Sequence, residues 1–179
     1  MKIILLTAII VVLLTSLFNR KLNVFKVIIE QFSIYKNDKT KKCSKYDIFT
    51  FFISPLTASI LLSFLIDLNF ILERSELFIT ILSIISTILF SFLALLIEKR
   101  ILFKNDKANQ VSNETYISII MTILYSLIAI IIMIGLLLVP TRKLLVRIFS
   151  IVIYYFAIKI ILNILMILKR MYLLLKNTD

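Results

Sequence analysis

The fold of this chain is decided by residues 77–97, which read LFITILSIISTILFSFLALLI. This run carries no charge, and about 20 mostly apolar residues are enough for a helix to cross the hydrocarbon core of a membrane. Residues 116–139 form a second uncharged run of similar length. Backbone groups in lipid have no water partner, and no alternating strand pattern is present, so both runs are predicted to be membrane-spanning helices.

Three further apolar runs extend this pair to five predicted spans. They are the short run 3–18, residues 48–72 around Asp67, and residues 144–168 around Arg147 and Lys159. The composition agrees, because 61% of the 179 residues are hydrophobic, against about 45–50% in a soluble domain. We therefore predict an all-α polytopic membrane helix bundle that occupies residues 1–179 as a single domain. Residues 3–18 lack a small-x-small cleavage pattern, which favours a retained anchor over a signal peptide.

The basic residues predict the orientation of the bundle. The chain has a formal net charge of +11, and most of its Lys and Arg fall in the segment 19–47, the connection 98–115 and the tail after residue 168. These three segments lie on one side of a five-span bundle, and basic loops remain in the cytoplasm. We therefore expect a bacterial cell inner-membrane protein with its N-terminus outside and its C-terminus cytoplasmic.

The predicted cytoplasmic segment 19–47 contains two features. Leu22, Phe25, Ile29 and Phe32 recur at helical spacing, which predicts an amphipathic helix that lies at the inner interface or continues the first span. A basic cluster follows, formed by Lys36, Lys39, Lys41, Lys42 and Lys45. Such a cluster sets topology and contacts anionic lipids, or it docks an acidic soluble protein. Nucleic acid is not expected as a partner, since no nucleic-acid-binding motif is present.

Small polar residues recur along two of the predicted spans. One row consists of Thr80, Ser83, Thr87, Ser91 and Ala94, and another of Ser118, Thr122, Ser126 and Ala129. Small residues let membrane helices approach closely and hydrogen-bond across the contact. Both rows are predicted to face neighbouring helices, with the lining of a polar path as the alternative.

Two charges near one predicted membrane boundary form a candidate ion pair. Asp67 and Arg147 lie at similar distances from the outer ends of their spans. A charge at the membrane centre costs about 2.5–3.5 kcal/mol, so a partner at the same depth is favoured. The alternative is that each side chain reaches the outer headgroups separately.

The deepest predicted cation lies on a polar stripe. Tyr155, Lys159 and Asn163 follow one another at steps of four residues, which places them on one helix face. The stripe faces the interior of a bundle or a wet cavity, or Lys159 extends toward the cytoplasmic headgroups.

Residue counts narrow the possible functions. The chain has no His, one Cys and one Gly, which excludes the usual zinc sites, His-based triads and glycine-rich nucleotide loops. We expect the chain to have no enzymatic activity and to bind neither a cofactor nor a metal ion. The favoured function is a non-catalytic, homo-oligomeric membrane subunit that docks a soluble cytoplasmic partner, by analogy of architecture in a bacterial stress or phage-defence (antiviral) system. The alternatives are an ion channel or pore, and a small transporter component.

Overall fold

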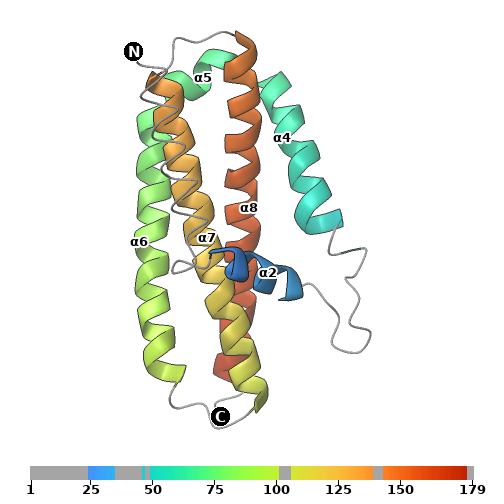
Figure 1. The fold of residues 1–179 in the computed structure, drawn as a ribbon, viewed down its shortest axis with the longest axis vertical. Coiled ribbons are helices and arrows are strands. Elements are labelled where there is room, and N and C mark those ends of the chain that lie inside the picture. Colours follow the sequence, from blue (N-terminus) through green and yellow to red (C-terminus); the bar gives the residue numbers. More distant parts are fainter. Residues whose placement is uncertain (1–23, 35–45, 47–48, 101–105, 139–142, 177–179) are drawn as a thin grey trace.

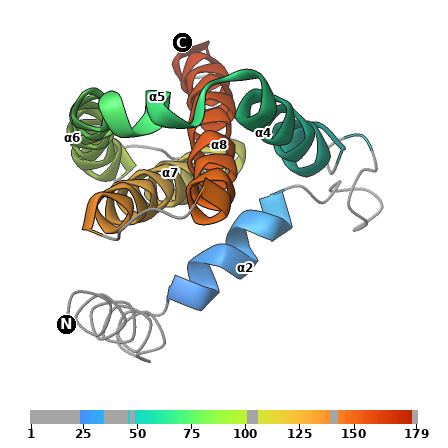
Figure 2. The same cartoon turned by 90° about the horizontal axis from the view of Figure 1, so that it is seen from above.

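The computed structural model describes residues 24–34, 46, 49–100, 106–138 and 143–176, and their regular elements are all helical. Three long helices lie side by side and form the body of the bundle, as Figures 1 and 2 show. They are α6 (Ser75–Arg100), α7 (Asp106–Leu138) and α8 (Lys143–Lys176). The prediction of an all-α fold is confirmed for these parts of the chain.

The three long helices are also the three candidate membrane spans. Their apolar portions run over Ser75–Glu98, Asn109–Leu137 and Lys143–Leu174. These portions include all of the predicted spans 77–97 and 144–168, and nearly all of the predicted span 116–139. α7 and α8 extend beyond the predicted runs, from Asp106 at one end and to Lys176 at the other. The predicted span 3–18 lies outside the described residues, so five passes and the orientation remain predictions.

The second predicted span, residues 48–72, is interrupted at Asp67, and its first part, Phe49–Leu65, is shorter than the three candidate spans. The structure divides this region into the π-helix η1 (Phe49–Ile53), α4 (Ser54–Leu65) and α5 (Leu68–Glu73). Pro55 lies in the first turn of α4, where its missing N–H is not needed by the helix. Ile66 is extended, with φ −93° and ψ 140°, and ends α4. The exposed Asp67 lies in the resulting break rather than inside a span.

Helix α2 (Val24–Ile34) lies in the predicted amphipathic segment, but Ile29 and Phe32 of its predicted apolar face are exposed. Ile29 is 65% exposed, whereas Gln31 is 3% exposed. α2 contacts α7, and Figures 1 and 2 show it lying across one side of the bundle. Its position at the inner interface stays a prediction.

The two rows of small polar residues have opposite outcomes. Ser118, Thr122 and Ser126 on α7 are fully buried, which confirms the predicted inward face. Ser126 shares a hydrogen bond of 2.7 Å between hydroxyl oxygens with Ser86 of α6. The predicted contact face of α6 is wrong within this chain, because its residues are exposed. They are Thr80, Ser83, Thr87, Ser91 and Ala94.

The apolar core lies between the three long helices. Leu82 of α6, Ala129 of α7 and Ile160 of α8 form one buried cluster near the middle of the bundle. Leu89, Ile119 and Ile167 belong to the next cluster toward the C-terminal end of α8. The packing fixes the rotation of α8 and so determines which of its polar residues face inward.

Candidate functional site

The predicted stripe on α8 is largely buried. Lys159 is 1% exposed and Asn163 is fully buried, whereas Tyr155 is half-buried. Lys159 lies at the middle of the candidate span Lys143–Leu174. Of the two interpretations of Lys159, this placement favours the interior position over extension to the headgroups.

An aromatic ring covers the ammonium group of Lys159. Its Nζ lies 3.9 Å from the ring centroid of Phe52 in η1. The Phe52 ring also stacks on Phe32 of α2 at a centroid distance of 5.3 Å. A desolvated cation–π contact is worth about 2 kcal/mol or more, which offsets much of the cost of a charge in the middle of a span. The π-helix η1 positions this ring, because it brings Phe52 against α8 at the middle of the candidate span.

The side chain of Asn163 differs from the Ser and Thr side chains of α7 in its hydrogen bonding. Its Oδ1 and Nδ2 are both buried without a hydrogen-bond partner. In contrast, the hydroxyl groups of Thr122 and Ser126 donate to backbone carbonyl groups one turn earlier in α7. Leaving a buried polar group unsatisfied costs about 1–3 kcal/mol. Asn163 therefore marks a buried position where packing alone does not account for the residue.

A second charged cluster, formed by Glu114, Ser118 and Arg170, joins α7 to α8. Arg170 Nη2 lies 3.3 Å from Glu114 Oε2. Its Nη1 donates to the hydroxyl group of Ser118 at 2.6 Å and to the backbone carbonyl of Glu114 at 3.1 Å. The Arg170 side chain is only 12% exposed.

This cluster was not predicted, because Arg170 was assigned to a cytoplasmic tail and Glu114 to a loop. A signal was present, since Arg170 follows Asn163 by seven residues and Lys159 by eleven. Those intervals return to nearly the same face of a helix. Extending the stripe along α8 would have predicted that Arg170 faces the bundle.

The contacts found for Arg147 join it to α4, and its predicted ion pair with Asp67 stays a prediction. Its guanidinium carbon lies 4.8 Å from the ring centroid of Phe64 in α4. The nearby Ser63 hydroxyl donates to the backbone carbonyl of Arg147 at 3.5 Å. Arg147 thus connects α8 to α4 through an aromatic ring and its own backbone.

The predicted docking lysines cannot be placed. Lys36, Lys39, Lys41, Lys42 and Lys45 lie outside the described residues. Within the residues that the structure describes, no group of three His, Cys, Asp or Glu could hold a metal ion.

Comparisons of the chain with protein-family models, curated proteins and solved structures find no match. The candidate sites are therefore defined by the contacts of their own residues: the stripe of α8 under Phe52, and the charged cluster near the end of the bundle.

Proposed function

We propose that the chain is a non-catalytic subunit of the bacterial inner membrane that assembles with copies of itself and docks a soluble cytoplasmic protein. Small membrane subunits of bacterial stress and phage-defence systems have this general architecture, and we propose such a system as its setting. The basic segment 19–47 would provide the docking surface, with anionic lipids around it.

The exposed polar face of α6 is the observation that carries the assembly part of this proposal. Thr80, Ser83, Thr87 and Ser91 turn away from α7, and each hydroxyl group donates to a carbonyl group one turn earlier. Their side chains are therefore satisfied and short, which lets a second helix approach closely. The apolar window of α6 is also the least buried of the three, at 22% against 44% for α7.

Replacing Ser83 and Thr87 together by Leu is expected to abolish self-assembly and leave the single chain stable. Bulky side chains would keep a second helix away, while neither position contributes to the core of the chain. Native mass spectrometry in mild detergent measures the assembly, and thermal melting measures the fold. The control exchanges the exposed neighbours Ile84 and Ile88 for Leu, which changes neither polarity nor volume. Unchanged assembly in the Ser83/Thr87 variant would contradict self-association through this face.

Reversing Lys39, Lys41 and Lys42 to Glu is expected to lower capture of a soluble partner at least tenfold. A cationic surface attracts an acidic partner, and raising the salt concentration should weaken capture in the same direction. Gentle extraction of the tagged protein followed by quantitative mass spectrometry measures the capture. Lys143→Glu is the control, because this exposed lysine lies at the far end of α8. If capture survives both the reversal and high salt, these lysines act only in topology.

A channel is the second candidate function. The buried Lys159 and Asn163 at mid-depth favour it, because polar side chains inside a span line the conduction paths of many channels. Ion flux into vesicles containing the purified protein tests this candidate. Absence of flux above that of protein-free vesicles would remove it.

A further inference from the structure

A groove of about 490 Å³ lies beside the charged cluster, between α7 and α8. Ile34 at the end of α2 and Phe51 of η1 line it from one side, and Leu162 and Met166 of α8 from the other. Glu114, Lys169 and Arg170 form its polar part. The groove therefore combines an apolar wall with charged side chains on the same helices.

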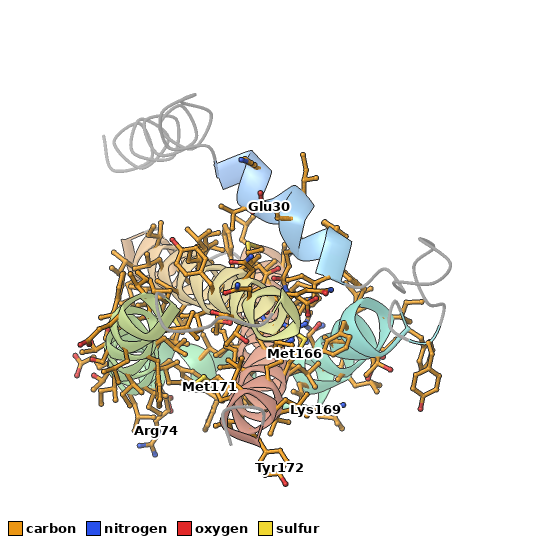
Figure 3. The ribbon with its side chains drawn as sticks, turned by 90° about the horizontal axis from the view of Figure 1, so that it is seen from below. Glu30, Arg74, Met166, Lys169, Met171 and Tyr172 are labelled. Carbon is orange, nitrogen blue, oxygen red and sulfur yellow. The ribbon has the colours of Figure 1, made fainter. Side chains whose placement is uncertain are left out.

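The basic residues of the groove are not equivalent. Arg170 is engaged by Glu114 and Ser118, as described above. Lys169 is exposed, and none of the ion pairs found among the described residues includes it. Figure 3 shows Lys169 on the side of α8 that faces α4. With the charge of Arg170 matched by Glu114, the groove keeps the positive charge of Lys169.

The position of Lys169 along α8 matches the edge of one membrane leaflet. Lys169 follows Lys159, which is at the middle of the candidate span Lys143–Leu174, by ten residues, or about 15 Å at 1.5 Å per residue. Half of a hydrocarbon core of about 30 Å is also about 15 Å. Leu162 and Met166 lie between these two lysines, so the apolar wall is at the depth of acyl chains.

We propose that this groove binds an anionic phospholipid. One acyl chain lies along Met166 and Leu162 beneath Phe51, and the headgroup phosphate lies against the ammonium group of Lys169. The net positive charge of the lining selects an anionic over a zwitterionic headgroup. The site is independent of the exposed α6 face and of the lysines at 39–42, so it can be tested apart from assembly and docking.

The test measures lipid binding by the full-length protein after removal of copurified lipid in detergent. Phosphatidylglycerol and phosphatidylcholine with identical acyl chains are added in turn, and native mass spectrometry and thermal melting record binding. We expect phosphatidylglycerol to bind and to raise the melting temperature more than phosphatidylcholine. Lys169→Gln should weaken phosphatidylglycerol binding about fivefold, the equivalent of about 1 kcal/mol for one basic residue near the membrane surface.

Two controls locate the effect in the groove. Lys26→Gln removes the same charge from an exposed residue of α2 outside the groove and should leave binding unchanged. Inorganic phosphate alone should give no thermal shift, because it has no acyl chain to fill the apolar wall. Equal binding of the two lipids, an unaltered Lys169→Gln variant, or full protection by phosphate alone would each overturn the proposal.

Discussion

Replacing Arg170 by Ala is expected to lower the free energy of unfolding by about 3 kcal/mol, the low end for breaking a buried ion pair. The side chain is 12% exposed and supplies donors to the Glu114 carboxylate, the Glu114 backbone carbonyl and the Ser118 hydroxyl group. Removing it leaves the carboxylate next to lipid without its counter-charge. Unfolding by SDS in mixed micelles, free of phospholipid, measures the change.

Three further variants separate this cluster from general effects at the end of α8. Lys169→Ala removes the neighbouring exposed cation and should change the free energy of unfolding by less than about 0.5 kcal/mol. Arg170→Lys keeps the charge and loses the forked geometry, so an intermediate loss is expected. Combining Arg170→Met with Glu114→Leu should recover most of the stability, since no unpaired charge remains. An Arg170→Ala protein that unfolds like the parent would show that the cluster does not hold α7 against α8.

The long helices were predictable because an uncharged run of about 20 residues has one stable arrangement in lipid. Residues 77–97 and 116–139 meet that condition without interruption. Residues 48–72 do not, since Asp67 interrupts them. A charge in an apolar run shows where the run is broken but not which way the chain turns there, and α4 ends at Leu65, just before Asp67.

The spacing of residues predicted which of them share a helix face, but it did not predict whether that face meets protein or lipid. On α6, Ser83 and Thr87 form a row, yet the residue that hydrogen-bonds α7 is Ser86. A Ser hydroxyl group satisfied by the preceding turn is compatible with either lipid or protein, so spacing alone does not choose between rows. On α7 the same kind of row faces inward, because that helix has neighbours on both sides and few of its faces meet lipid.

Charges were hardest to place from sequence, because the positive-inside rule counts residues without regard to contacts. It assigned Arg170 to a tail, although the helix continues to Lys176 and turns this side chain toward α7. Phe52 gave no signal at all, since nothing in its spacing links it to Lys159. That contact exists only because η1 begins at mid-depth beside α8.

A double-mutant cycle between Lys159 and Phe52 is expected to give a coupling of about 2 kcal/mol, the value of a desolvated cation–π contact. Lys159→Met alone should change the free energy of unfolding by less than about 1 kcal/mol, since loss of the contact offsets relief of a buried charge. Phe52→Leu should then be more costly in the parent than in the Lys159→Met protein. SDS unfolding of the four proteins measures the coupling.

Another cation–π pair among the described residues provides the control for this cycle. Arg147 lies over Phe64, whose ring is exposed, so Arg147→Met and Phe64→Leu should couple by only about 0.5 kcal/mol. Both cycles measure a cation–π contact, and the two contacts differ in how deeply they are buried. A larger coupling energy at Lys159 would therefore measure the effect of removing its ammonium group from water. A coupling near zero at Lys159 would mean that its ammonium group reaches the headgroups. Lys159 would then no longer belong to the buried stripe of α8, and the proposal of a channel would lose the observation that supports it.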